Sequence, residues 1–209
     1  YYGEFFYCPI STIDYINQLT KTPLAVIIDE RNVGIDDIQT LLSPCVEKVK
    51  MIRMAVDPKN ISSAIQKAQV INKMGFEVAF NLMYLSEWVK DYKFLDQIIG
   101  IENYIDYFYM VDSFGAIYPN QLKPLIIEIK KRTKVKLGFH GHNNLELAHA
   151  NSLIALEEGV DIIDSTILGM GRGSGNLKTE LFLSTLSKKF SININFNSLS
   201  KVLEDFQNL

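Results

Sequence analysis

The sequence predicts an α/β fold built from repeated βα units, and within that class a TIM (β/α)8 barrel. Short runs of Val, Ile, Phe, Tyr and Met alternate with longer amphipathic stretches almost to the end of the chain, as in parallel strands joined by helices. Polar residues of chemical interest follow several different strand candidates, as they do in barrels. A glycine-rich loop over residues 169–176 follows the last strand candidate, whereas a dinucleotide-binding sheet has its glycine motif after the first.

Six strands are expected, and most of them are apolar throughout, as strands buried on both faces are. They cover residues 24–28, 49–56, 76–83, 107–111, 135–140 and 161–168. A closed barrel has eight strands, so two further βα units, roughly 50–70 residues in all, are expected before Tyr1.

The amphipathic stretches predict helices over residues 35–42, 60–74, 86–99, 119–132, 145–158, 181–190 and 199–206. In 60–74 the apolar residues recur at the spacing of one helix face. Gly75 and Gly159 stand where two of these helices should end. Pro119 falls in a first turn, where a missing N–H leaves no helical hydrogen bond unmade.

Composition limits the partners and the compartment. With 209 residues, 47% hydrophobic and 22% charged, the chain is typical of a single globular domain. A net charge of −3 without a run of like charges argues against nucleic acid or an anionic membrane as partner. Cys8 and Cys45 fit neither a disulfide framework nor a C-x-x-C metal motif. The sequence has no apolar stretch of membrane length and no signal-peptide pattern, so a cytoplasmic location is expected.

His140 and His142 come at the end of an apolar run. Residues two apart in an extended strand point to the same side, so the two imidazoles can converge on one small volume. A pair of neutral imidazoles is a common start of a divalent-metal site, although two histidines satisfied by hydrogen bonds are the simpler alternative. His149 falls on the following helix, where a packing role is favoured.

Three blocks of sequence resemble the metal-dependent aldolases and lyases that share a barrel with a D-x-x-x-R-D-G metal loop, the HMGL-like group. The blocks are Met-Val-Asp-Ser-Phe-Gly-Ala over 110–116, Gly-Phe-His-Gly-His-Asn-Asn-Leu over 138–145 with Ala-Asn-Ser-Leu over 150–153, and Gly-Met-Gly-Arg-Gly-Ser-Gly-Asn over 169–176. The first and third are most similar to the 4-hydroxy-2-oxovalerate aldolase branch, which has Asp-Ser-Gly-Gly and Gly-Met-Gly there. The resemblance implies that the six strands are strands three to eight of the barrel, and that residues 1–209 form a single partial catalytic domain.

The resemblance also implies a ligand set for the metal. His140 and His142 would be ligands. Asn176 would be a further ligand through its side-chain carbonyl, or else the N-cap of a helix that starts at Leu177. The ion would be Mn, Mg, Co or Zn, since such a donor set does not choose among them by geometry alone.

Substrate contacts are implied in the first and third blocks. Ser113 would hold the carboxylate of a 2-oxo acid through its hydroxyl and backbone N–H, while Asp112 orients the loop, unless the pair simply makes a turn. Arg172 would either attract an anionic substrate or lie in solvent.

One part of the family pattern has no counterpart in this sequence. The first-strand loop of the family supplies a metal-binding aspartate and an arginine that polarises the substrate carbonyl. Asp29-Glu30-Arg31 follows the wrong unit to be that loop. The catalytic arginine and the general base are therefore expected outside this chain.

The implied activity is that of an aldolase. It would cleave or form a C–C bond of a 4-hydroxy-2-oxo acid, giving pyruvate and an aldehyde through a metal-stabilised enolate. A Claisen-type acyl-CoA condensing enzyme or lyase is an alternative, although the glycine loop lacks the cysteine of the lyase branch. A non-catalytic metal- or ligand-binding barrel is the alternative of another class. A homo-oligomer and, by resemblance, an aldehyde dehydrogenase partner are also considered.

Overall fold

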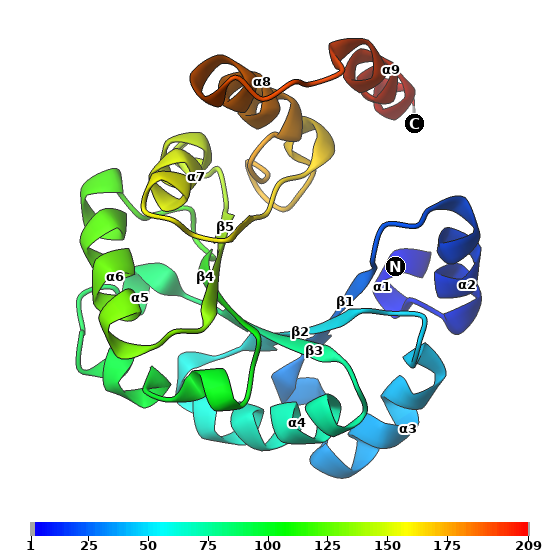
Figure 1. The fold of residues 1–209 in the computed structure, drawn as a ribbon, viewed down its shortest axis with the longest axis vertical. Coiled ribbons are helices and arrows are strands. Elements are labelled where there is room, and N and C mark those ends of the chain that lie inside the picture. The colour runs from blue at the N-terminus through cyan, green and yellow to red at the C-terminus, as the bar shows by residue number, and fades with distance from the viewer. Residues whose placement is uncertain (1–2, 209) are drawn as a thin grey trace. The chain divides into compact units, whose positions relative to one another are not determined.

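The computed structural model describes residues 3–208, and within them six strands form one sheet in the order β1-β2-β3-β4-β5-β6 (Figure 1). The strands are β1 Ala25–Asp29, β2 Met51–Val56, β3 Glu77–Leu82, β4 Tyr107–Asp112, β5 Lys136–Gly141 and β6 Ile162–Ile163. β1 pairs with β2, β2 with β3, and β5 with β6, each in parallel. The prediction of six strands in an α/β chain is confirmed.

The described helices fall mostly between the strands. They are α1 Glu4–Tyr7, α2 Ile10–Leu19, α3 Ile38–Leu42, α4 Ile61–Lys73, α5 Leu85–Trp88, α6 Pro119–Arg132, α7 Ala148–Glu157, α8 Thr179–Phe190 and α9 Phe196–Gln207. Helix α6 has the predicted bounds, and α4, α8 and α9 differ from prediction by a few residues at their ends. The helices α1 and α2 were not predicted.

The chain divides into two compact units. Within the described residues, the first unit comprises the chain up to Met83 together with Gln97–Tyr109 and Thr133–Lys136. The second unit comprises Tyr84–Asp96, Met110–Arg132 and the chain from Leu137 onward. Every residue predicted to bind metal or substrate lies in the second unit.

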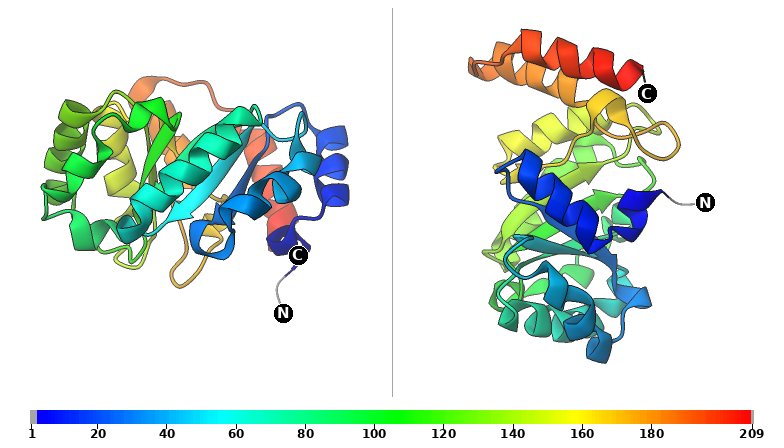
Figure 2. Two further views of the ribbon diagram at one scale, coloured as in Figure 1. Left: turned by 90° about the horizontal axis from the view of Figure 1, so that it is seen from below. Right: turned by 90° about the vertical axis from the view of Figure 1, so that its right-hand side faces the viewer.

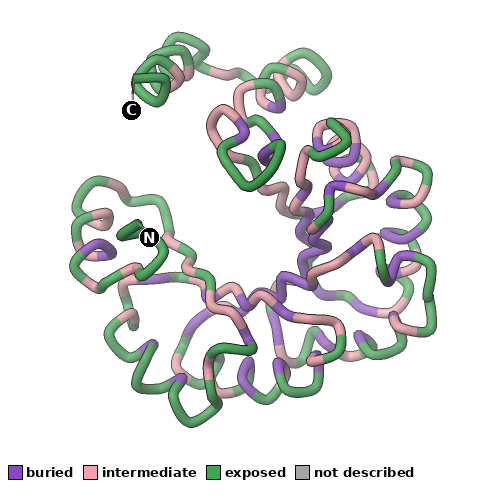
Figure 3. The backbone as a smooth tube through the Cα atoms, turned by 180° about the vertical axis from the view of Figure 1, so that it is seen from behind, coloured by how far each residue is buried: buried purple, intermediate pink, exposed green. Residues whose placement is uncertain are grey.

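The core of the first unit lies between its strands and α4. Strand β2 alternates in burial, and its Ile52, Met54 and Val56 have no exposed surface. Helix α4 packs on β2 and β3. Its buried apolar residues, at the spacing of one helix face, are Ile61, Ala64, Ala68 and Ile71. Figure 3 shows that the buried stretches follow the strands. Each large aliphatic side chain that is fully buried contributes roughly 1.5–3 kcal/mol to the free energy of folding.

A buried ion pair joins the end of β1 to α4 in the first unit. Glu30 is only 2% exposed, and its carboxylate lies 2.7 Å from Nζ of Lys67. Ser63 and Asn60 donate further hydrogen bonds to the same carboxylate at 2.8 and 3.0 Å. Burial alone would raise the pKa of Glu30, but the hydrogen bonds from Lys67, Ser63 and Asn60 outweigh it, and the pKa is lowered.

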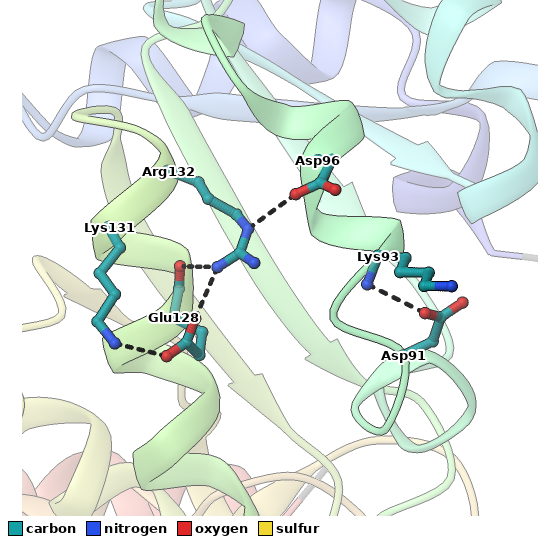
Figure 4. Close-up of polar contacts among 6 residues, drawn as sticks. All are labelled: Asp91, Lys93, Asp96, Glu128, Lys131 and Arg132. Carbon is teal, nitrogen blue, oxygen red and sulfur yellow. Dashed lines mark hydrogen bonds and ion pairs between the residues drawn. The ribbon is translucent and has the colours of Figure 1, made fainter.

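In the second unit α6 and α7 pack against each other (Figures 1 and 2). The buried face of α6 consists of Leu122, Leu125, Ile126 and Ile129. The last turn of α6 carries ion pairs (Figure 4): Arg132 contacts Glu128 at 2.7 Å and Asp96 at 3.1 Å. Solvent screens such surface pairs, so they contribute little to stability.

The predicted strand over 161–168 is wrong beyond its first residues. Only Ile162–Ile163 pairs as a strand. After Asp164 the chain enters a 3₁₀ turn, Ile167–Gly169, in which Leu168 has a φ of 56°. An apolar run alone cannot reveal such a turn, because Ile and Leu suit a strand and a buried turn equally.

Three predicted helices also differ. The helix expected over 86–99 is broken into α5 and a 3₁₀ segment, Phe94–Ile98. Between them the Asp91 carboxylate accepts from the Lys93 backbone N–H at 3.0 Å (Figure 4), a local turn that competes with helix. The helix over 145–158 begins only at Ala148, since Glu146 has a φ of 56°. The helix over 35–42 starts as a 3₁₀ turn, Ile35–Asp37. None of the described helices is long and apolar enough to cross a membrane.

Candidate functional site

The two histidines of the H-x-H motif lie together at the end of β5. His140 is in the strand, and His142 is the first residue after it. Their ring centroids are 4.9 Å apart, with the ring planes at 70°. The convergence of the two imidazoles predicted from their spacing is therefore present.

Each of these rings is anchored through Nδ1. His142 Nδ1 lies 2.9 Å from the backbone carbonyl of Asp112, which can only accept, so this nitrogen carries the proton. His140 Nδ1 lies 2.9 Å from the carboxylate of Asp164, which favours the same tautomer. In the neutral rings, both Nε2 atoms then have lone pairs for a ligand, the arrangement usual for metal-binding histidines.

The electrostatics of the site favour neutral His142. Burial lowers the pKa of His142, and the nearby His140 and the Arg172 cation lower it further, against the opposing effect of Asp112. A neutral imidazole is the form that binds a metal ion, because a protonated one has no lone pair to offer.

Asn176 supplies a third donor at the end of the glycine loop. Its Nδ2 donates to the Met170 carbonyl at 2.8 Å, which fixes the orientation of the amide. Its Oδ1 is buried and has no hydrogen-bond partner among the described residues. Leaving a buried acceptor unpaired costs about 1–3 kcal/mol, and a bound cation would remove that cost. His142 and Asn176 also form an isolated antiparallel bridge, which holds the two loops together.

The helix that follows does not begin at Asn176. Helix α8 starts at Thr179, and its N-cap is Lys178. The N-cap alternative for Asn176 is therefore wrong. Its amide oxygen remains as a candidate metal ligand beside the two imidazoles. In residues 3–208, no group of three or more His, Cys, Asp or Glu side chains could hold a metal ion. The fit to a divalent ion thus depends on two imidazole nitrogens and one amide oxygen.

Asp112 organises the loop after β4. Its carboxylate is 1% exposed and accepts from the backbone N–H groups of Ala116 and Ile117 at 3.0 and 3.3 Å. Burial raises the pKa of Asp112, although these two hydrogen bonds oppose the rise. The side chain thus lies under the loop and holds it, as the predicted orienting role requires.

Ser113 lies at the start of the same loop. Its Oγ accepts from the Tyr84 backbone N–H at 2.9 Å, so the hydroxyl proton is left to donate. The backbone N–H of Ser113 donates to the Val111 carbonyl at 2.9 Å. That N–H is engaged within the loop, so the hydroxyl is the group of Ser113 that is available to a carboxylate.

Arg172 lies exposed at the tip of the glycine loop. Its backbone carbonyl accepts from the Gly175 N–H at 2.9 Å, which closes a turn. The pKa of His142 is lowered first by burial, then by His140, and Arg172 adds only the smallest of these contributions. A role in attracting substrate stays a prediction.

Two residues with clear roles in this geometry were not predicted. Asp164 orients His140, but the expected strand over 161–168 placed it in mid-strand rather than at a strand end. Asn144 contacts two other loops, and its only sequence signal is its place directly after the H-x-H-N motif.

The remaining polar candidates are structural. His149 lies on α7, with Nε2 2.9 Å from Thr185 Oγ1 and its ring edge-on to Phe182, so the packing role predicted for it fits its contacts. Asp29 pairs with Arg31 at 2.8 Å in the first unit.

Fold and site together define a class, an α/β chain with paired histidines and a buried amide oxygen in the loops that follow its later strands. The sequence profile of the HMGL-like family matches residues 32–205, and the chain belongs to that family. A 4-hydroxy-2-oxovalerate aldolase of Geobacillus thermodenitrificans (strain NG80-2) is 34% identical over 156 residues, covering 74% of this chain and 45% of that protein. The chain spans about half the length of the curated relatives it matches.

Solved structures agree with this assignment. The N-terminal domain of a candidate aldolase from Bacteroides vulgatus matches with a TM-score of 0.96 and 44% identity, over 100% of this chain and 70% of that one. The HMG-CoA lyase of Bacillus subtilis matches with a TM-score of 0.66 over 94% of this chain and 85% of that one. Its identity of 19% makes it a likeness of fold alone. The predicted TIM-barrel class, with six strands present, agrees with these neighbours.

Proposed function

We propose that this chain carries the metal and substrate loops of a divalent-metal-dependent aldolase that acts on a 4-hydroxy-2-oxo acid, giving pyruvate and an aldehyde. The observation that carries the proposal is the pair of imidazoles anchored through Nδ1 beside an unpaired buried amide oxygen. Relatives named 4-hydroxy-2-oxovalerate aldolase support the choice of reaction.

His140 and His142 would hold the ion through Nε2, and Asn176 would hold it through Oδ1. When bound, a divalent ion supplies Lewis-acid polarisation of the keto group of a 2-oxo acid. Oxygen and imidazole donors suit Mn, Mg, Co and Zn, and availability would choose among them.

Ser113 would bind the carboxylate of the 2-oxo acid. Its oxygen is fixed by the Tyr84 N–H, so its proton can be directed at an anion, and hydrogen bonds to charged acceptors are the stronger kind. Asp112 keeps this loop in place from below. Arg172, which is exposed, would attract the anion at longer range, an effect that salt should weaken.

The test is pyruvate release by the full-length protein with Mn²⁺. A panel of 4-hydroxy-2-oxo acids with different aldehyde parts would be assayed through lactate dehydrogenase and NADH. At least one should be turned over. Ser113→Ala should raise its KM about tenfold, the value of one hydrogen bond to a charged group. Ser200→Ala, on the exposed face of α9, is the matched control and should change nothing.

Other outcomes would discriminate between the alternatives. Absence of pyruvate from every member of the panel would contradict the aldolase proposal. Release of CoA from acetyl-CoA in the presence of 2-oxo acids would instead identify the Claisen-type reaction. The aldehyde dehydrogenase partner and the homo-oligomer stay predictions, and co-purification and light scattering on the same protein would test them.

A further inference from the structure

Asn144 lies where three loops of the second unit meet. It belongs to the loop after β5. Its Nδ2 donates to the Phe114 carbonyl at 2.9 Å, in the loop after β4. Its Oδ1 accepts from the Ser174 backbone N–H at 3.3 Å, in the glycine loop. One carboxamide therefore joins the loop that carries Ser113 to the loop that carries Asn176.

Both neighbouring loops approach Asn144 with a glycine. A Cβ on Gly173 would lie 2.9 Å from Asn144 Oδ1. A Cβ on Gly115 would lie 2.8 Å from the Asn144 backbone nitrogen and 3.1 Å from its Cβ. The contact with the Asn144 backbone nitrogen cannot be relieved without moving the chain. Gly115 and Gly173 also have φ values of 56° and 59°, which favour glycine at both points. The three loops are thus packed around this residue as well as hydrogen-bonded to it.

Each loop also has contacts that do not involve Asn144. The loop after β4 is held by Asp112 and by Asn151, whose Nδ2 donates to the Ile117 carbonyl at 2.8 Å. Within the glycine loop the Asn176 amide is fixed on the Met170 carbonyl. Loss of the Asn144 carboxamide should therefore leave each loop formed, while removing a bond between them.

We propose that Asn144 is a positioning residue that couples the substrate-carboxylate loop to the metal loop, so that a 2-oxo acid and a divalent cation strengthen each other's binding. The inference rests on the proposed function, because it takes Ser113 as the carboxylate contact and Asn176 as a cation ligand. Two loops held in one arrangement before binding lose less freedom when a single ligand engages both. Such coupling is reciprocal between the two ligands.

The experiment measures Mn²⁺ affinity of the full-length protein by EPR, with and without saturating pyruvate. In the wild type, pyruvate should tighten Mn²⁺ binding. In Asn144→Ala that enhancement should fall about fivefold, the value of one net hydrogen bond, while the affinity for Mn²⁺ alone should stay within about twofold. Asn144→Asp keeps an acceptor for Ser174 but cannot donate to Phe114, so it should lose the enhancement as well.

Asn120→Ala is the matched control, because Asn120 is an exposed asparagine on α6 of the same unit. An enhancement that is unchanged in Asn144→Ala would overturn the inference. So would an equal weakening of Mn²⁺ binding with and without pyruvate, which marks a merely structural role. If Asn144→Ala has a lowered unfolding temperature and Asn144→Asp does not, the Asp variant is the test: loss of the pyruvate enhancement in it supports the inference, and an unchanged enhancement overturns it. A wild-type protein that binds Mn²⁺ with no response to pyruvate would overturn the proposed function and this inference together.

Discussion

The chemistry of His140 and His142 depends on what their Nδ1 atoms contact. A backbone carbonyl and a carboxylate occupy that nitrogen in the two rings. His149 differs, because its Nε2, not its Nδ1, makes the hydrogen bond, with Thr185. The three histidines of this chain are therefore separated into two with Nε2 available for a ligand and one engaged in packing α7 on α8.

Substitution of these histidines should separate metal binding from folding. His140→Ala and His142→Ala should each abolish stoichiometric Mn²⁺ binding. Their losses should exceed the roughly 10–100-fold typical of residues that only orient a ligand. Both side chains lie near the end of a strand and are only partly buried, so the unfolding temperature should change little. His149→Ala is the control and should keep its metal. Equal metal content in the His140, His142 double variant would refute the site, and metal analysis after gel filtration measures it.

The sequence predicts these single residues only in part. Spacing alone brought His140 and His142 together, because strand geometry is regular. The unpaired Oδ1 of Asn176 depends on a loop conformation set by contacts far along the chain, and no local pattern encodes it. The same holds for the partner of His140, Asp164, which becomes visible only once β6 is known to end before it.

At the scale of elements, the glycine loop is shaped around the Asn176 amide. A Cβ on Gly171 would lie 2.5 Å from Asn176 Nδ2 and 2.8 Å from its Cγ. The amide is already held by the Met170 carbonyl, so it can yield only by breaking that bond. Glycine at this position is thus required by the close approach of a candidate ligand.

Gly171→Ala should therefore weaken Mn²⁺ binding about tenfold, in the range found when a ligand loses its orienting contacts. Stability should change little, because Gly171 is exposed and its loop adds little to the core. Gly3→Ala, where an added methyl meets nothing within 4 Å, is the control. Calorimetric titration of Mn²⁺ into the three proteins measures the effect. An unchanged affinity in Gly171→Ala would mean that Asn176 does not contact the ion.

The elements themselves follow from the sequence where one periodicity dominates. The apolar runs located β1 to β5, and the helical spacing gave α4 and the full extent of α6. Prediction failed where short-range turn chemistry competes with periodicity, as at Asp91 between α5 and the 3₁₀ segment Phe94–Ile98. Prediction also failed after β6, where the end of the apolar run forms the 3₁₀ turn Ile167–Gly169 and not a strand.

At the scale of the whole molecule, the structure assigns stability and chemistry to different groups of acidic residues. Glu30 is buried against Lys67 in the first unit. In the second unit the Asp164 carboxylate contacts His140, and Asp112 contacts His142 through its backbone carbonyl. This division agrees with the register inferred from the sequence, in which Asp29-Glu30-Arg31 is not the metal loop of the family.

The variant Glu30→Gln tests this register, because a structural Glu30 should affect the free energy of unfolding and not metal binding. Removing the charge leaves Lys67 buried without its counter-ion, which should cost about 3–5 kcal/mol of unfolding free energy at pH 7. Glu77→Gln, which breaks a solvent-screened surface pair with Lys50, should change the unfolding free energy far less. Urea unfolding of the three proteins measures both differences.

The stability lost in Glu30→Gln should also depend on pH. The pKa of Glu30 is lower in the folded protein than its ordinary value, which is about 4.3 in an unfolded chain. Below that value the unfolded state binds more protons than the folded state, so the stability contributed by Glu30 is complete above about pH 5 and is lost as pH falls through the folded pKa. The gap between wild type and Glu30→Gln should therefore narrow on acidification. Mn²⁺ affinity at pH 7 should be equal in the two proteins. If Glu30→Gln loses metal and not stability, Glu30 belongs to the metal site and the strand register is wrong.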